Sequence, residues 1–170
     1  MLGPDYYDKE YFDGGKGYHT YADATHFFET AQMIKERFSP KSVLELGCAK
    51  GYLVKALRSL GVSAFGLDVS GYAIDNADEE VKPYLTVLDF TAESATNRYD
   101  LIVSIDTFEH IPEEKLESVK KFLLATADRY YIKVATPHTP DWEHDKSHVT
   151  IKELSWWQEW MPEAHWEESK

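Results

Sequence analysis

The sequence predicts a single α/β domain built on a doubly wound, mostly parallel β-sheet with flanking helices. Two observations support this prediction. Between Ser42 and Ala135, short runs of β-branched and apolar residues alternate with longer stretches of helical period, which is the pattern of a parallel sheet covered on both faces. The length of 170 residues suits one domain of this kind and is too short for two.

Five short runs have the length and composition of β-strands. The first and the fourth are almost continuously apolar, as expected for central strands that are buried on both faces. The five runs are SVLELG from Ser42, SAFGLDV from Ser63, LTVLDF from Leu85, DLIVSID from Asp100 and RYYIKVA from Arg129.

Apolar spacing and end signals predict the helices. A helix over 24–38 precedes the first strand, and another follows that strand directly. A helix after the fourth strand has Pro112 at its first position. Thr150 and Glu153 form a capping box for a last helix that carries three tryptophans. The stretch 91–98 is short and polar, and we expect it to be a loop.

The chain before the first strand is rich in aromatic residues. We divide the single domain, 1–170, into an N-terminal part (1–39), a core (40–135) and a substrate-side loop with the last helix (136–170). The aromatic segment is interrupted by glycines, so we expect a lid that closes over the site; the alternative is a strand or turn packed on the sheet edge. Its aromatic residues are Tyr6, Tyr7, Tyr11, Phe12, Tyr18 and Tyr21.

Charge and cysteine content exclude several classes of function. The net charge of −12 and the pI near 4.9 give a field that repels phosphate backbones and anionic lipids, so we expect neither nucleic acid nor membrane as a partner. The single cysteine, Cys48, excludes an internal disulfide. No apolar run reaches membrane-spanning length, and the N-terminus does not resemble a signal peptide. We therefore expect a cytoplasmic protein.

The turn after the first strand carries the pattern of a nucleotide-binding loop. A strand that turns sharply into a helix through small residues brings backbone N–H groups and the helix N-terminus against a ligand. Gly47, Ala49 and Gly51 occupy this turn. The dinucleotide fingerprint would place a further small residue at Tyr52, so the spacing argues against a nicotinamide-dependent oxidoreductase, which remains an alternative.

Acidic residues accompany the turn and the ends of the next two strands. Glu45 lies within an apolar strand, where a carboxylate needs a cationic ligand or a turn amide as its partner. Asp68 ends the second strand, where it can accept hydrogen bonds from ribose hydroxyls. Asp89 ends the third strand and can accept from an adenine amino group, with the amide of Phe90 beside it.

Four stretches together resemble the successive motifs of class I, Rossmann-like S-adenosylmethionine-dependent methyltransferases of the small-molecule type. These are VLELGCAKGYLV, GLDVSGYAIDNA, LDF and YDLIVSIDTFEHI. The resemblance implies S-adenosylmethionine as cofactor and S-adenosylhomocysteine as product. It implies that the first motif holds the methionine part, that Asp68 binds ribose and Asp89 binds adenine, and that the stretch 106–110 borders donor and substrate. Ala49 departs from the glycine that the family usually has there.

The expected cofactor site combines these residues with the aromatic segment and the end of the fourth strand. Its members are Glu45, Gly47, Cys48, Ala49, Gly51, Asp68, Val69, Asp89, Phe90, Asp106 and Tyr21, with Cys48 expected mainly to fill space.

Two histidines are the candidates for catalysis. His110 follows the fourth strand and His148 precedes the last helix, so both should lie at the carboxyl edge of the sheet, where a hydroxyl acceptor would need a base. His138, His144 and Asp145 together with His148 suggest a divalent metal. Because their spacing follows no established ligand pattern, we assign no metal ligands.

We therefore expect an S-adenosylmethionine-dependent methyltransferase that transfers a methyl group in line to a small polar molecule, such as a sugar or natural-product intermediate. The alternative from another class is a non-catalytic S-adenosylmethionine-binding or interaction module, a fragment of a larger protein. Methyltransferases of this class have a sixth strand and an antiparallel seventh, whereas this sequence ends near the start of a sixth, at 165–168. We expect an incomplete sheet, whose exposed edge invites pairing with a second copy.

Overall fold

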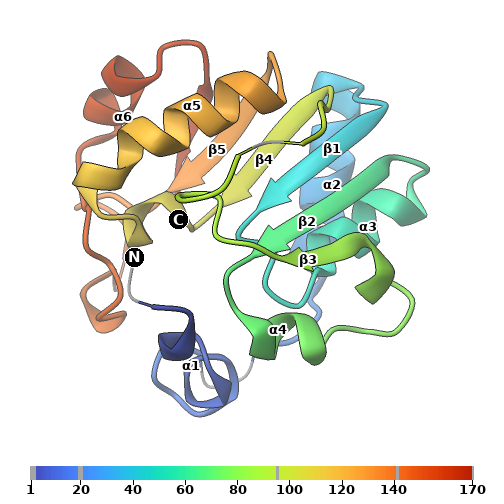
Figure 1. The fold of residues 1–170 in the computed structure, drawn as a ribbon, viewed down its shortest axis with the longest axis horizontal. Helices are drawn as coiled ribbons and strands as arrows, with labels where there is room; N and C mark the ends of the chain where they lie inside the picture. The colour runs from blue at the N-terminus through green and yellow to red at the C-terminus, as the bar shows by residue number, and fades with distance from the viewer. Residues whose placement is uncertain (1–2, 19–20, 95, 141, 170) are drawn as a thin grey trace.

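The computed structural model describes residues 3–18, 21–94, 96–140 and 142–169, and it shows an α/β fold (Figure 1). The strands are β1 (Ser42–Leu46), β2 (Ser63–Asp68), β3 (Leu85–Val87), β4 (Leu101–Ile105), β5 (Tyr130–Val134) and β6 (His165–Glu168). The α-helices are α1 (Lys9–Asp13), α2 (Thr25–Phe38), α3 (Tyr52–Ser59), α4 (Gly71–Asp75), α5 (Leu116–Thr126) and α6 (Leu154–Trp160). Short 3-10 helices are η1 (Pro4–Tyr6), η2 (Lys82–Tyr84), η3 (Phe108–His110), η4 (Glu113–Lys115) and η5 (Trp142–His144).

The six strands form one parallel sheet in the order β3-β2-β1-β4-β5-β6. The strand order reverses between β1 and β4, which is the switch point where ligands bind in open α/β sheets. Leu46 at the end of β1 pairs with Leu67 of β2 and with Ser104 of β4, so the carboxyl ends of these three strands lie level. Residues that follow them therefore meet at one edge.

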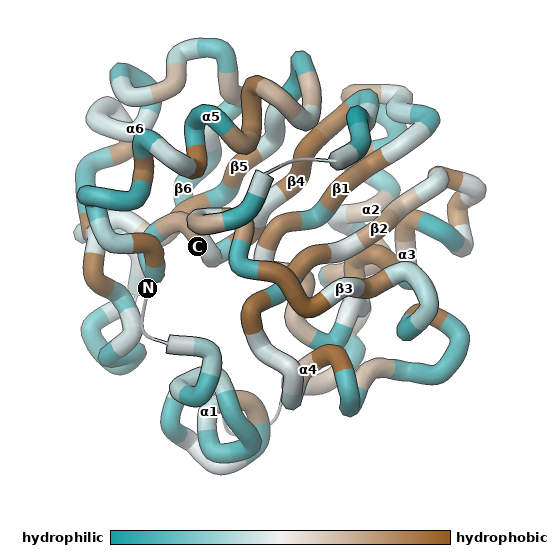
Figure 2. Tube along the Cα trace, in the orientation of Figure 1, coloured by the Kyte–Doolittle hydropathy of each residue, from teal (hydrophilic) through white to brown (hydrophobic). Residues whose placement is uncertain are grey.

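The core has two layers because alternate residues of each strand face opposite sides of the sheet. On one face, Val43 and Val103 pack with α2 and α3 residues such as Ile34 and Leu57. On the other face, Leu44 and Ile102 pack with α5 and α6. Hydrophobic segments accordingly run along the central strands in Figure 2. This two-sided burial explains why β1 and β4 are almost continuously apolar.

The predicted fold class and all five expected strands are confirmed, and the sixth run also forms a strand. β6 pairs in parallel with β5, and its Trp166 is buried against α6. The edge strands of the sheet are thus β3 and β6, and pairing of copies through an edge stays a prediction.

Two predicted helix starts were wrong. Pro112 precedes the 3-10 turn η4, and α5 begins only at Leu116. Thr150 forms no capping box, because its hydroxyl donates 2.6 Å to the carbonyl of Ile111. The last helix begins at Leu154 without a side-chain cap, so a contact distant in sequence outcompetes the local one.

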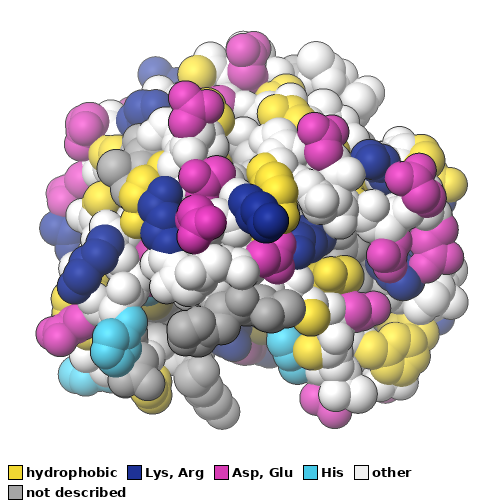
Figure 3. Space-filling view, turned by 90° about the horizontal axis from the view of Figure 1, so that it is seen from below, with side chains coloured by type: hydrophobic (Ala, Val, Ile, Leu, Met, Phe, Trp, Pro, Cys, Tyr) yellow, Lys and Arg dark blue, Asp and Glu magenta, His cyan; other side chains and the backbone are white. Residues whose placement is uncertain are grey.

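No helix among the described residues is both long and apolar enough to cross a membrane. On the face drawn in Figure 3, basic and acidic side chains are interspersed, as the scattered lysines and arginines of the sequence predict.

Candidate active site

The turn from β1 into α3 adopts left-handed backbone angles at three residues. The φ values are 75° at Gly47, 49° at Ala49 and 74° at Gly51. A Cβ atom on Gly47 would lie 2.1 Å from Oγ1 of Thr107, so only glycine fits between β1 and the end of β4. The amides of Gly47 and Cys48 donate to the carbonyl of Leu67, which fixes the turn to β2.

Asp68 joins the ends of β1 and β2. Its carboxylate accepts from the amide of Ala49 and from the amide of Ser70, each at 2.7 Å. Burial raises the pKa of Asp68, and these backbone amides oppose the rise. Because each carboxylate oxygen can accept more than one hydrogen bond, Asp68 can still accept from a ligand hydroxyl.

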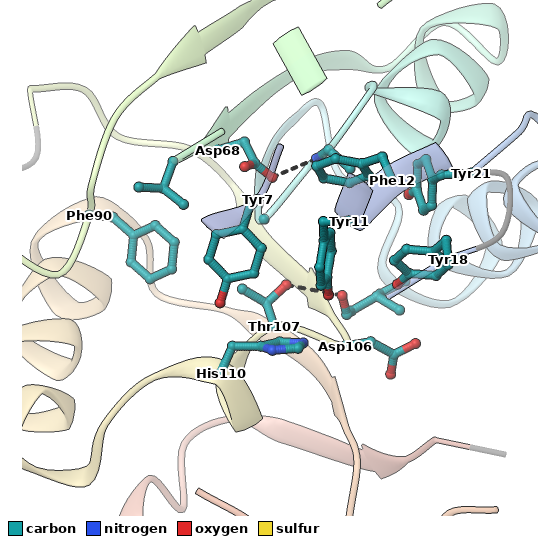
Figure 4. A pocket seen from close by; sticks show the side chains of 14 residues that line it. Tyr7, Tyr11, Phe12, Tyr18, Tyr21, Asp68, Phe90, Asp106, Thr107 and His110 are labelled. Atoms are coloured by element: carbon teal, nitrogen blue, oxygen red, sulfur yellow. Dashed lines mark hydrogen bonds between the residues drawn. The ribbon is translucent and has the colours of Figure 1, made fainter. Parts of the chain in front are cut away.

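A cavity of about 80 Å³ lies over this edge, and we call it the first cavity (Figure 4). Asp68 lies at one end, His110 at the other, and the Tyr7 and Tyr11 rings lie between them. Ligand pockets typically enclose roughly 300–1,000 Å³, so the aromatic segment fills much of the space that a ligand of nucleoside size requires. The other lining residues are Phe12, Tyr18, Tyr21, Gly47, Ala49, Val69, Phe90, Ile105, Asp106 and Thr107.

Several polar contacts hold the aromatic segment over the first cavity. The hydroxyl of Tyr11 donates 2.8 Å to Asp145, and the carbonyl of Tyr7 accepts 2.5 Å from Ser70. Asp13, at the end of α1, accepts a hydrogen bond of 2.9 Å from the ammonium of Lys50, which lies in the β1–α3 turn. Tyr7, Tyr11 and Phe12 are also buried in a hydrophobic cluster with Ala49 and Ala73, and lid motion stays a prediction.

A second cavity, of about 790 Å³, adjoins the first at Gly47, Ile105 and Asp106. Glu45 lines it and is buried. Burial raises the pKa of Glu45 well above its usual value, the charge of Asp68 adds to the rise, and the backbone amide of Val54 opposes it. Its Oε2 atom has no hydrogen-bond partner within the described residues. An unpaired carboxyl oxygen in a cavity wall suits a cationic ligand group.

His110 stands at the wall of the first cavity in a hydrogen-bonded chain. Its Nδ1 lies 2.8 Å from Oγ of Ser147, and Ser147 donates 2.5 Å to the carboxylate of Asp145. Since the single hydroxyl proton goes to Asp145, the Nδ1–H of His110 donates to Ser147 and Nε2 is left as the acceptor. Burial, with a smaller contribution from His148, lowers the pKa of His110 to about 4.

His148 is brought beside His110, with ring centres 4.7 Å apart. It does not line the first cavity. Its Nδ1 donates 2.6 Å to the carbonyl of Trp142.

Glu109 lies within the stretch 106–110 that the resemblance placed beside donor and substrate, but the sequence assigned it no role of its own. It is fully buried, and its Oε1 accepts 3.1 Å from the amide of Ala135. Oε2 has no partner in the described part of the chain. Burial, with a smaller contribution from the charge of Asp106, raises the pKa of Glu109 to about 8. The signal was present in the motif FEHI, where an acidic residue precedes the histidine.

Three expected cofactor residues do not line either cavity. The side chain of Cys48 is directed into the core, where it packs on Gly66 of β2. Gly51 packs against Leu85. Asp89 caps its own turn: its Oδ1 accepts from the amide and hydroxyl of Thr91 at 2.9 and 2.6 Å.

The remaining expected cofactor residues are brought together at the two cavities. They are Glu45, Gly47, Ala49, Asp68, Val69, Phe90, Asp106 and Tyr21. Lys50, Asp13 and Ser147 hold this region together without having been singled out by any sequence pattern.

Comparison with known proteins gives one curated relative. It is the ubiquinone biosynthesis O-methyltransferase of Paraburkholderia xenovorans strain LB400, 31% identical over 80 residues, which are 43% of this chain and 34% of that protein.

Solved structures share the fold. A SAM-dependent methyltransferase from Archaeoglobus fulgidus superposes with a TM-score of 0.70 at 14% identity, over 88% of this chain and 70% of that one. The plantazolicin methyltransferase BpumL in complex with SAH superposes with a TM-score of 0.60 at 19% identity, over 79% of this chain and 60% of that one. The chain thus spans about a third of the curated relative and 60% of the plantazolicin enzyme.

The family described as "Methyltransferase domain" matches residues 15–167. This range takes in the β1–α3 turn, β1 to β5 and most of the residues that line the two cavities, and it ends within β6. The chain therefore belongs to the methyltransferase-domain family, and its sheet has the Rossmann-like fold of class I methyltransferases.

Proposed function

We propose that this protein is an S-adenosylmethionine-dependent methyltransferase that methylates a hydroxyl of a small polar molecule, such as a sugar or natural-product intermediate. The observation that carries the proposal is the pair of adjoining cavities, which place the unpaired Glu45 oxygen, Asp68 and His110 along one edge of the sheet. Family membership and an O-methyltransferase among the relatives support it.

The residues at this edge suit the chemical groups of the donor. The unpaired oxygen of Glu45 suits an ammonium group, so the methionine part belongs in the second cavity. Asp68 suits the ribose hydroxyls, and Val69 and Phe90 suit the faces of an adenine ring. Asp89, directed into its own turn, has no role in this assignment. When bound, S-adenosylmethionine supplies an electrophilic methyl group on a positively charged sulfur.

The protein's own task is to position the acceptor, exclude water and manage one proton. The aromatic segment covers the first cavity, which keeps the reacting atoms dry once it is closed. A hydroxyl must lose its proton as it is methylated. His110 has its ring fixed by Ser147 and Asp145, and His148 lies beside it. We therefore place the acceptor hydroxyl at this pair of histidines.

Calorimetric titration with S-adenosylhomocysteine tests the donor site. Asp68→Ala removes an acceptor for two ribose hydroxyls and should weaken binding by at least about tenfold, since a hydrogen bond to a charged group contributes roughly 1.5–3 kcal/mol. The matched control is Asp89→Ala, which makes the same chemical change outside both cavities and should bind nearly as the wild type does. Circular dichroism checks that each variant is folded. The proposal is refuted if the wild-type protein does not bind S-adenosylhomocysteine at millimolar concentration.

Turnover separates an enzyme from a binding module. The wild-type protein, given S-adenosylmethionine and a panel of sugars and phenols, should release S-adenosylhomocysteine with at least one of them. Binding of the donor without turnover on any member of the panel would favour the non-catalytic module instead.

A further inference from the structure

Three side chains with metal-binding atoms converge behind the wall of the first cavity. Glu109 and His110 lie in η3 directly after β4, and His148 comes from the loop before α6. One ligand atom from each of the three lies within 4.8 Å of the other two. Glu109 and His110 are buried, and His148 is half-buried. The group differs from the cluster suggested by the sequence, because His138 is exposed and pairs with Glu153.

Glu109 supplies an independent sign that a ligand belongs there. Its Oε2 is buried and has no hydrogen-bond partner within the described residues, although the other oxygen is held by the amide of Ala135. Leaving a buried carboxyl oxygen without a partner costs roughly 1–3 kcal/mol or more. Such an atom is stabilised by a cation placed against it.

Both histidines are oriented as metal ligands commonly are. Nδ1 of His110 donates to Ser147, which donates to the Asp145 carboxylate, and Nδ1 of His148 donates to the carbonyl of Trp142. Metal-binding histidines usually donate their second ring N–H to a carboxylate, carbonyl or water in this way, which fixes the tautomer. In each ring the nitrogen left for an ion is Nε2.

The backbone also holds the two segments together. The carbonyl of Glu109 accepts from the amides of Val149 and Thr150, each at 2.9 Å. The loop that carries His148 is therefore anchored to η3 before any ion arrives.

We propose that Glu109, His110 and His148 bind one divalent first-row transition-metal ion. Two imidazoles and one carboxylate form the ligand set of many catalytic zinc sites, which keep a position open for water or substrate. Bonds of about 2.0–2.2 Å in a tetrahedral site place ligand atoms about 3.4 Å apart, so side-chain adjustments of roughly an ångström close the group around an ion. Imidazole ligands favour zinc, cobalt, iron or nickel over magnesium or calcium.

The inference deepens the proposed function and rests on it only for the role of the ion. Because His110 lines the first cavity, an ion on its ring lies beside the place assigned to the acceptor. A hydroxyl that coordinates a divalent ion loses its proton at lower pH, and the proton passes to water. The two histidines then act as ligands and not as free bases.

Cobalt(II) titration of the full chain, stripped of metal with EDTA and freed of the chelator, tests the site through visible absorption bands. The wild type should bind one equivalent. His148→Gln and Glu109→Gln should each weaken binding by at least about tenfold, since even the partners of metal ligands contribute 10- to 100-fold to affinity. The matched control is His138→Gln, the same change at an exposed histidine, which should leave cobalt affinity unchanged.

Absence of saturable binding at millimolar cobalt, or a His148→Gln variant that binds as the wild type does, overturns the inference. Circular dichroism shows whether each variant is folded. If Glu109→Gln does not fold, X-ray absorption of the wild-type cobalt complex decides: scattering from two imidazoles is expected, and its absence overturns the inference. Parallel calorimetry with S-adenosylhomocysteine separates the two proposals. Donor-product binding without cobalt binding removes only the metal site, and cobalt binding without donor-product binding supports the metal site and removes the proposed function.

Discussion

Replacing Gly47 by alanine tests whether the β1–α3 turn has the tight geometry on which the site depends. Gly47 has a φ of 75°, and an added Cβ would lie 2.1 Å from Oγ1 and 2.6 Å from Cγ2 of Thr107. Gly61, after α3, has a similar φ of 82°, but a Cβ there would meet nothing within 4 Å. The two glycines thus share the backbone penalty, and only Gly47 adds a steric one.

The magnitudes follow from this difference. A non-glycine residue in the left-handed region costs roughly 1–2 kcal/mol, which is the whole expected effect of Gly61→Ala. Forcing a methyl group into a packed site costs typically about 1–3 kcal/mol more, so Gly47→Ala should lower the free energy of unfolding by about 2–5 kcal/mol. For a protein of this size, each kcal/mol corresponds to about 2–4 °C in Tm.

Urea and thermal unfolding of the two variants provide the measurement. Thr107→Ala removes the two closest atoms but leaves the Cβ of residue 107 at 2.9 Å, so it should recover part of the steric cost of about 1–3 kcal/mol in a double-mutant cycle. Gly47→Ala should also weaken S-adenosylhomocysteine binding, because Gly47 lines both cavities. The reasoning is refuted if Gly47→Ala is no less stable than Gly61→Ala, or if Thr107→Ala recovers nothing.

Three further predictions concern the lid and the donor site. Tyr11→Phe removes the 2.8 Å hydrogen bond to Asp145 and should make the N-terminal segment more sensitive to chymotrypsin; cleavage at the wild-type rate would contradict the assigned anchor. S-adenosylhomocysteine should slow the same cleavage in the wild type, because the segment covers the first cavity, and unchanged cleavage under saturating ligand would contradict lid closure. Glu45→Gln should stabilise the ligand-free protein increasingly as pH rises above 4.5, since an acid whose folded pKa is raised loses stability over the range from its unfolded to its folded pKa. The same variant should bind S-adenosylhomocysteine more weakly, and a loss of stability with unchanged binding, by unfolding and calorimetry, would assign Glu45 a structural role.

Periodicity was sufficient to predict the sheet. β1 and β4 are buried on both faces, and that environment demands continuous apolar runs that are visible in the sequence. The turn was also predictable, because a left-handed backbone and close approach to Thr107 leave room only for glycine at position 47. Asp68 was predicted from its place at the end of the second strand, and the structure adds that it accepts from the amide of Ala49.

Residues outside regular elements were not predictable in the same way. Asp89 and Phe90 are adjacent, and which of them faces the cavity depends on the Thr91 amide and hydroxyl that bind the carboxylate. His148 follows an irregular loop whose place is set by amides that bind the Glu109 carbonyl, and such contacts leave no period. The hydrogen bond from the amide of Ala135 to Glu109 could not be predicted for the same reason.

The carboxyl edge of the sheet gathers buried acidic side chains. Among the residues that the structure describes, Glu45 and Glu109 each keep one buried oxygen without a partner, and Asp68 lies between the turn and the first cavity. Burying such groups lowers stability, so an edge of this kind is best explained by ligands that bring positive charge. The proposed donor brings an ammonium and a sulfonium group to the Glu45 side, and the proposed ion brings two charges to the Glu109 side. Because Glu45 lines the second cavity, whereas Glu109 lines neither cavity and belongs to the group with His110 and His148, the ligands should stabilise the fold independently, and their effects on Tm should add.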